Sequence, residues 1–171
     1  VGCCAIDDYL GEVIKKHENT REEKELDRIR HVDRMDAQTG PIFLAYRHSG
    51  EIQAIVEQVK RGTPLYDFAA EDGVRHRVWR VEEPGQEEAI RTAFERIPSL
   101  YIADGHHRAA SAVKVGLMRR KEHPDYTGEE PFNYFLSVLF PDAELSILPY
   151  NRVVRDLNGL GEEAFLAAVR K

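Results

Sequence analysis

The stretch Tyr101-Ile-Ala-Asp-Gly-His-His-Arg-Ala-Ala-Ser111 predicts a strand, a tight turn and a helix in immediate succession. The apolar run at 100–103 is typical of a strand that ends at Asp104. Gly105 permits the unusual backbone angles of a tight turn. The helix expected over 106–121 carries two histidines and an arginine in its first turn, and its alanines allow close packing on a sheet.

The basic residues at the start of this helix favour an anionic ligand. The first N–H groups of a helix have no partner within it and the helix dipole is positive there, so cations are unfavourable unless a negative group lies nearby. Arg108 can bind a phosphate through two parallel hydrogen bonds, and His106 and His107 can donate to it from beside Gly105. Two alternatives stay open. In the first, Asp104 only caps the helix and the basic residues are solvated. In the second, the histidines bind a metal, although adjacent histidines on a helix point in different directions.

The composition is that of an ordinary globular protein. The 171 residues include 24 Lys and Arg against 30 Asp and Glu, a formal charge of −6, and 42% are hydrophobic. The negative balance argues against a nucleic-acid surface, so nucleic acid is not an expected partner. No run approaches the roughly 18 apolar residues of a membrane span. The two cysteines, Cys3 and Cys4, are adjacent, which excludes a disulfide framework, fits a reducing cytoplasm and predicts packed, inert thiols.

Strands, hairpins and helices alternate along the chain, which predicts the α+β class with a mixed sheet flanked by helices. Helix starts are expected at a Thr20–Glu23 capping box, at Ser49 and after a Pro84-Gly85 turn. The expected helices cover 21–35, 51–60, 86–97, 106–121 and the stretch beyond 159. The expected strands cover 1–6, 42–46 in the buried centre, 65–70, 74–81, 100–103, 132–140 and 145–148. Both ends lie inside regular patterns, so we expect a fragment of a longer protein.

Each charged motif outside the turn has an ordinary structural interpretation. Glu18 precedes a capped helix, where a carboxylate usually only improves the electrostatics. The charged run 24–31 is typical of a solvated helix face. Arg152 could reach a phosphate, but an exposed strand position is slightly favoured. The stretch Arg75-His-Arg-Val-Trp-Arg80 mixes cations with an aromatic ring as nucleic-acid surfaces do, but a hairpin strand with arginine outward and valine inward explains it more simply.

The order of the motifs resembles the ParB/sulfiredoxin-like superfamily and, within it, the free-serine kinases. Those proteins have an early His-Glu pair, here His17-Glu18, then a Pro-Ile strand, here Pro41-Ile42, and then an Asp-Gly-His-His-Arg turn, here 104–108. Over nearly the whole chain the sequence is similar to a bacterial family known only as domain of unknown function 1015. The motifs that carry this similarity are Lys15-Lys-His-Glu18, Lys24-Glu-Leu-Asp-Arg28, Asp36-Ala-Gln-Thr-Gly-Pro41, Val74-Arg-His-Arg-Val-Trp79, Asp104-Gly-His-His-Arg108 and Pro149-Tyr-Asn-Arg152.

The resemblance implies a single ParB/sulfiredoxin-like domain over 1–171. Residues 47–98 depart from the shorter connection of the serine kinases, and we expect them to form a helix–hairpin–helix insertion. The resemblance implies a kinase that transfers a phosphoryl group from ADP or ATP, with Mg²⁺, to the hydroxyl of a small molecule, free L-serine being the best candidate. A nucleotide-binding regulatory module without kinase activity, as in ParB, is the alternative. A redox protein like sulfiredoxin ranks last, because the turn holds histidine where that chemistry needs cysteine.

The resemblance also implies a role for each residue of the site. Glu18 would be the base that accepts the proton of the hydroxyl, and Asp104 would orient the hydroxyl or the metal. The phosphates would be held by Gly105, His106, His107 and Arg108. His17 and Arg152 would support these groups, and no protein metal site is expected apart from carboxylates that help to hold Mg²⁺.

Overall fold

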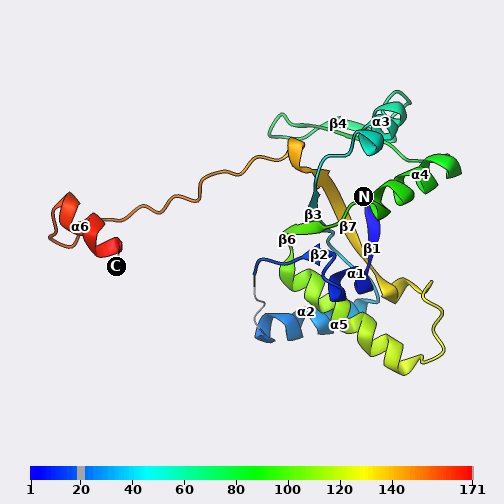
Figure 1. The fold of residues 1–171 in the computed structure, drawn as a ribbon, viewed down its shortest axis with the longest axis horizontal. Helices are drawn as coiled ribbons and strands as arrows, with labels where there is room; N and C mark the ends of the chain where they lie inside the picture. Colours follow the sequence, from blue (N-terminus) through cyan, green and yellow to red (C-terminus); the bar gives the residue numbers. More distant parts are fainter. Residues whose placement is uncertain (19–21, 171) are drawn as a thin grey trace.

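A five-stranded mixed sheet forms the centre of the computed structural model, which describes residues 1–18 and 22–170 (Figure 1). The strands lie in the order β1 (Gly2–Ala5), β7 (Tyr134–Pro141), β3 (Ile42–Tyr46), β6 (Leu100–Asp104) and β2 (Ile14–Lys15). β3 is parallel to β7 and antiparallel to β6, and β2 is parallel to β6. This arrangement confirms the α+β class with a mixed sheet, and it confirms that 42–46 is the central strand.

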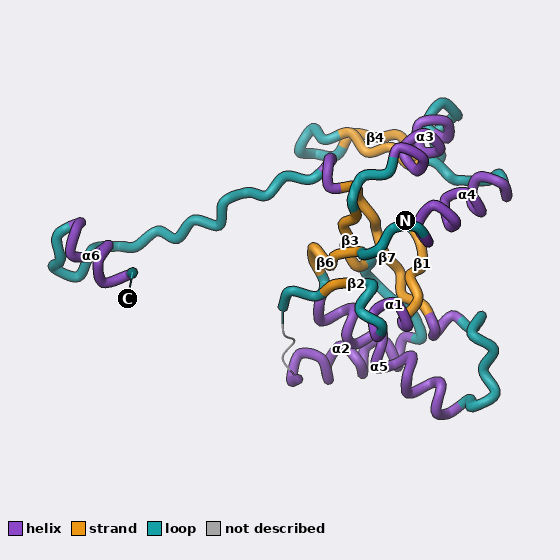
Figure 2. The backbone as a smooth tube through the Cα atoms, viewed as in Figure 1, coloured by secondary structure: helices purple, strands orange, loops and turns teal. Residues whose placement is uncertain are grey.

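Helix α5 (His106–Glu122) covers one face of the sheet, and α2 (Glu22–Met35) packs against α5 in turn (Figure 2). The small buried residues Ala109 and Ala112 let α5 approach the sheet closely, as their size predicts. Along β3 the residues at 42, 44 and 46 are buried while those at 43 and 45 are half-buried. The central strand therefore buries one face fully and the other only in part. Thr20 of the expected capping box lies outside the described residues.

Between β3 and β6 the chain forms α3 (Gly50–Val59), the strands β4 (Tyr66–Ala69) and β5 (Arg75–Val78), and α4 (Pro84–Glu95). The hydroxyl of Ser49 caps α3 by accepting the Ile52 N–H at 3.5 Å, as the sequence predicts. Gly73 adopts φ +81° in the turn between β4 and β5, which a glycine tolerates. The expected turn at Pro84-Gly85 is wrong, because this pair forms the first turn of α4, where a proline needs no partner for its nitrogen.

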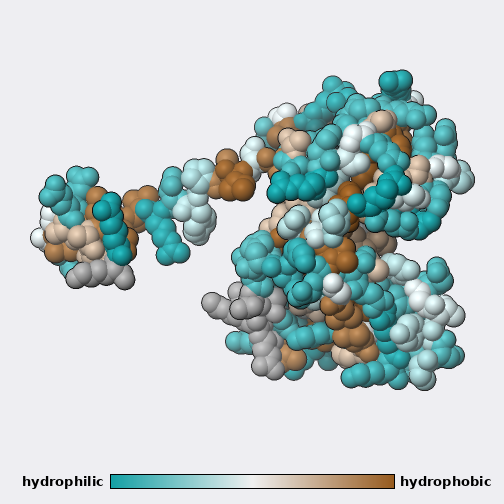
Figure 3. All heavy atoms as spheres, viewed as in Figure 1, coloured by the Kyte–Doolittle hydropathy of each residue, from teal (hydrophilic) through white to brown (hydrophobic). Residues whose placement is uncertain are grey.

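Two further expectations about the strands are wrong. The valines of the hairpin do not point into a core, since all residues of β4 and β5 are exposed and Val78 keeps 46% of its surface. Residues 145–148 form no strand, because the chain leaves the body here in an extended segment that leads to α6 (Glu162–Val169; Figure 1). Ile147 is 99% exposed in this segment, whose hydrophobic side chains stand out in Figure 3.

The first strand separates the two cysteines. Cys4 is buried in the core, which confirms the prediction of a packed thiol, and burial raises the pKa of this thiol to about 11, which disfavours the reactive thiolate. Cys3 is exposed, so the prediction of a packed thiol is wrong for this residue. The reason is the pleat of β1, which turns successive side chains to opposite faces. The strand is also shorter than the expected range of 1–6, because helix α1 (Ile6–Leu10) begins at Ile6.

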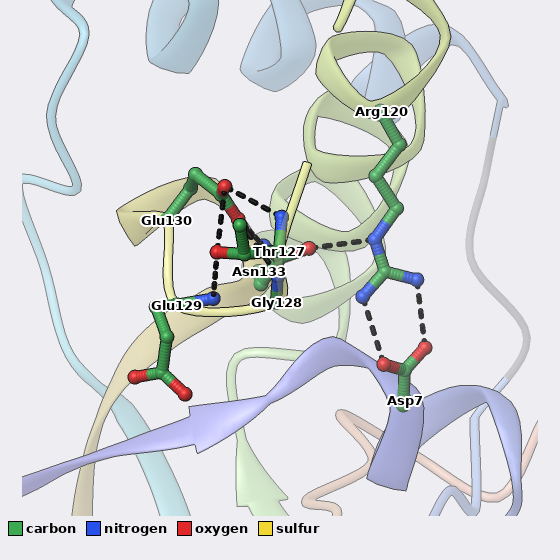
Figure 4. A network of polar contacts seen from close by, with 7 residues as sticks. All are labelled: Asp7, Arg120, Thr127, Gly128, Glu129, Glu130 and Asn133. Carbon is green, nitrogen blue, oxygen red and sulfur yellow. Dashed lines mark hydrogen bonds and ion pairs between the residues drawn. The ribbon is translucent and has the colours of Figure 1, made fainter. Parts of the chain in front are cut away.

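A network of polar contacts ties the loop before β7 to α5 and α1 (Figure 4). The guanidinium of Arg120 donates to both carboxylate oxygens of Asp7 at 2.8 Å and to Asn133 Oδ1 at 2.6 Å. Asn133 donates to Glu130 at 3.0 Å, and Glu130 also accepts the backbone N–H groups of Thr127 and Gly128. These contacts hold α5 in place along its C-terminal half.

We expect the substitution Glu130→Gln to lower Tm and to remove part of the acid sensitivity of the fold. Hydrogen bonds, first from the Thr127 backbone, lower the Glu130 pKa from 4.5 to about 2. A carboxyl with a lowered native pKa stabilises the fold above pH 4.5, and this contribution disappears as the pH falls toward 2. Thermal unfolding between pH 7 and pH 2 measures the effect. Glu129→Gln is the matched control because the Glu129 side chain points away from the network (Figure 4), and equal pH profiles for both variants would contradict the assignment.

None of the helices in residues 1–18 and 22–170 combines the length and apolar character that a membrane span requires.

Candidate functional site

Three segments that lie far apart in the sequence meet at one edge of the sheet. β2 and β6 are parallel, with Lys15 opposite Tyr101, so the residues after each of them emerge on the same side. β3 runs antiparallel to β6, with Phe43 opposite Asp104, so the residues before β3 reach the same edge. The structure thereby brings together His17-Glu18, Gly40-Pro41 and the turn at 104–108.

A cleft of about 740 Å³ opens where these segments meet the start of α2. Its lining contains four carboxylates, two guanidinium groups and two imidazoles. The lining residues are Glu18, Glu23, Asp27, Arg28, Asp104, Gly105, His106, His107 and Arg108. Six of the eight residues predicted for the site line this cleft. Within the described part of the chain, no group of three or more His, Cys, Asp or Glu is arranged to hold a metal ion.

Two glycines make room for the side chain of Arg108. Gly105 adopts φ +97° before the first residue of α5, and a Cβ there would approach the Arg108 guanidinium to 3.0 Å. A Cβ on Gly40 would lie 3.2 Å from Nη1 of the same side chain. The guanidinium therefore lies against the backbone of both loops, and the positive φ of Gly105 favours glycine at this turn.

Arg108 holds the edge of the site together. Its Nη1 donates to the carbonyl of Pro41 at 2.5 Å, and its Nη2 donates to Asp104 Oδ2 at 2.6 Å. The Asp104 side chain remains 71% exposed toward the cleft. Arg108 thus orients the Asp104 carboxylate and joins the start of β3 to the start of α5, in addition to any contact with a ligand.

His106 is buried behind Glu18. Only 5% of its surface is exposed, its Nε2 accepts the backbone N–H of His17 at 3.5 Å, and its Nδ1 lies 3.7 Å from Glu18 Oε2. Burial, and next the neighbouring His17, lower the pKa of His106 below its usual 6.5. A neutral ring that accepts at Nε2 carries its proton on Nδ1, so the N–H of His106 faces the Glu18 carboxylate.

The titration of His106 tests this geometry without any ligand. We expect its imidazole to titrate below 6.5, and we expect Glu18→Gln to lower the midpoint further. The carboxylate of Glu18 favours the protonated ring, and removing a nearby negative charge lowers the pKa of a base. NMR observation of the histidine ring signals against pH measures both values. A His106 midpoint that does not respond to Glu18→Gln would place the two side chains apart.

The remaining predicted residues lie outside the cleft lining. His17 is exposed and contacts His106 through the ring edge, with ring centres 4.4 Å apart. Arg152 is exposed in the extended segment after residue 144. Because this segment leaves the body of the molecule (Figure 1), Arg152 does not line the cleft in this structure.

Sequence reasoning misses the contribution of α2. Glu23, Asp27 and Arg28 line the cleft, whereas the charged run 24–31 reads as a solvated helix face. Glu23 and Asp27 are four residues apart and therefore share one side of the helix. No local pattern in the sequence distinguishes these three charged residues from the others of α2.

The fold and the cleft define an α+β domain with a polar site built at the ends of its strands. The chain belongs to the family described as Protein of unknown function (DUF1015), which matches residues 1–171. No curated protein and no solved structure gives a significant match.

Proposed function

We propose that this domain is a small-molecule kinase that transfers a phosphoryl group from ADP or ATP to a hydroxyl, with free L-serine as the preferred candidate acceptor. The observation that supports this most is the shared cleft of Glu18, Asp104 and the first turn of α5. A base, an orienting carboxylate and a phosphate-binding helix start are what phosphoryl transfer needs from a protein. We assign the sheet and turn to the ParB/sulfiredoxin-like type, with residues 47–98 as an insertion.

The start of α5 is the proposed phosphate site. The backbone of Gly105 and the first N–H groups of the helix, together with His107, would contact the phosphate oxygens. Four carboxylates against two guanidinium groups make the cleft unfavourable for a bare anion. A nucleotide would therefore enter as its Mg²⁺ complex, since Mg²⁺ neutralises charge on the phosphate oxygens when bound. Asp104 and Glu18 offer carboxylate oxygens near this point.

Glu18 is the proposed base. Its side chain is 61% exposed, so a substrate hydroxyl can reach it, and His106 restrains it from behind. As the hydroxyl oxygen forms its bond to the terminal phosphorus, its proton passes to Glu18 and the bond to the leaving nucleotide oxygen breaks. A positioned base of this kind accelerates such a step by about 10²–10⁴-fold.

A ³¹P NMR time course tests the proposal directly. The chain is mixed with Mg²⁺, L-serine and either ATP or ADP, and the spectrum is followed for a phosphoserine resonance. Its appearance, with a matching loss of the donor signal, supports the kinase. Broadening of the nucleotide signals without turnover would favour the regulatory module over the kinase. Unchanged nucleotide signals would contradict the phosphate site.

A further inference from the structure

The two arginines of the cleft differ in what they already bind. Arg108 donates to the carbonyl of Pro41 and to Asp104, so part of its donor capacity is used within the protein. Arg28 lines the same cleft, and its side chain makes no hydrogen bond or ion pair with any residue that the structure describes. Among the described residues, no acceptor uses the donors of Arg28, so its guanidinium can donate to a ligand in the cleft that it lines.

The position of Arg28 is determined by the packing of α2 on α5. Both helices begin on the same side of the molecule (Figure 1). Lys114 on α5 pairs with the buried Glu25, and Arg119 on α5 donates to Asp33 at 2.9 Å. These contacts lie on both sides of Arg28 along α2. They hold its backbone at a set distance from the start of α5, which is what selective recognition of a small ligand requires.

We propose that Arg28 recognises a carboxylate on the acceptor and thereby determines which hydroxyl compounds enter the cleft. This inference rests on the proposed kinase function and adds a specificity-determining residue to it. Glu18 and Asp104 line the cleft from the sheet edge, whereas Arg28 lines it from α2. An acceptor between them presents its hydroxyl to Glu18 and its carboxylate to the planar fork of Arg28, which matches carboxylate geometry.

Matched ligands and variants test this role in the full chain. L-serine and L-serinamide, which lacks the carboxylate charge, are titrated by NMR into the wild type and Arg28→Gln with Mg²⁺ and a non-hydrolysable ATP analogue. Losing one charge-assisted hydrogen-bonding partner should weaken L-serine binding about tenfold or more in the variant. L-serinamide should bind the wild type about as weakly as L-serine binds Arg28→Gln. The substitution should change the affinity for L-serinamide little. Arg30→Gln is the control, since Arg30 is exposed on the same helix and does not line the cleft.

The outcomes separate this inference from the proposed function. If Arg28→Gln and the change from L-serine to L-serinamide each weaken binding, but together weaken it no further, the inference is supported. This holds even if no phosphoserine forms, a result that would contradict only the kinase function. Phosphorylation of serine and serinamide at equal rates supports the kinase and overturns the role of Arg28. Equal affinity of L-serine for the wild type and Arg28→Gln, or no binding of L-serine at all, also overturns it. A substitution that weakens nucleotide binding instead would assign Arg28 to the donor phosphates.

Discussion

The substitution Glu18→Gln is expected to reduce phosphoryl transfer by about 10²–10⁴-fold, because an amide cannot accept the proton of the attacking hydroxyl. Nucleotide binding should persist, since the start of α5 and Asp104 remain in place. The side chain is mostly exposed, and its contact with the neutral His106 spans 3.7 Å, so the fold should tolerate the change. The variant therefore separates the chemical step from the binding of its substrates.

Phosphoserine formation and nucleotide affinity are both measured for Glu18→Gln, so that a loss of the chemical step is distinguished from a loss of binding. ³¹P NMR gives the transfer rate, and line broadening of the nucleotide signals gives binding for the same samples. Glu122→Gln is the matched control, because Glu122 is an exposed glutamate at the opposite end of α5. A Glu18→Gln protein that transfers phosphoryl at near-normal rates would remove Glu18 from the role of base. A variant that loses nucleotide binding as well would make Glu18 part of the nucleotide site.

The substitution Gly116→Ala is expected to destabilise the fold by about 2 kcal/mol, within the range for overpacked cores. Gly116 is a buried residue of α5, and a Cβ there would approach the carbonyl oxygen of Phe132 to less than 3.0 Å and Ile6 Cδ1 to 2.8 Å. The carbonyl belongs to the backbone just before β7 and the Ile6 side chain is fully buried, so the new methyl requires a shift of the backbone or of the core. Alanine gains about 1 kcal/mol over glycine as a helix former, which does not offset this clash.

Chemical and thermal unfolding followed by circular dichroism measure this loss, which should lower Tm by several degrees. Gly85→Ala provides the matched comparison, because Gly85 lies in α4 and a Cβ there meets nothing within 4 Å. The same exchange should therefore leave the fold unchanged or slightly stabilised at Gly85. If Gly116→Ala is as stable as Gly85→Ala, α5 does not pack against the backbone at Phe132 in the way described.

Local patterns predicted the elements that carry the strongest signals. The central strand has the predicted bounds of 42–46, and the strand–turn–helix begins and ends within one residue of the prediction. These segments combine a continuous apolar run, a glycine and a helix rich in alanine, so local preference and tertiary packing favour the same structure. The prediction of a strand at 145–148 failed because an apolar run becomes a strand only where a neighbour supplies hydrogen bonds and burial.

The candidate site was predicted in part. The turn at 104–108 is visible in the sequence because basic residues at a helix start oppose the dipole. Glu18 entered the site through the resemblance to a family, since a carboxylate before a helix is common. The charged neighbours of Arg28 predict a solvent-facing side chain, because no periodicity distinguishes a residue that faces water from one that faces a polar cleft.

The sequence by itself determined the strand–turn–helix around Gly105, because a glycine turn and an alanine-rich helix depend mainly on residues close in the chain. The apolar run at 42–46 indicated a buried strand, and its partners β6 and β7 were decided by the tertiary structure. Tertiary structure alone decided that the parallel pairing of β2 with β6 places Glu18 beside His106. It also decided that Arg108 binds Asp104 and Pro41 while Arg28 faces the cleft. Strand pairing and helix packing set these distances, and both depend on contacts between residues 86 and 89 positions apart, which no local pattern encodes.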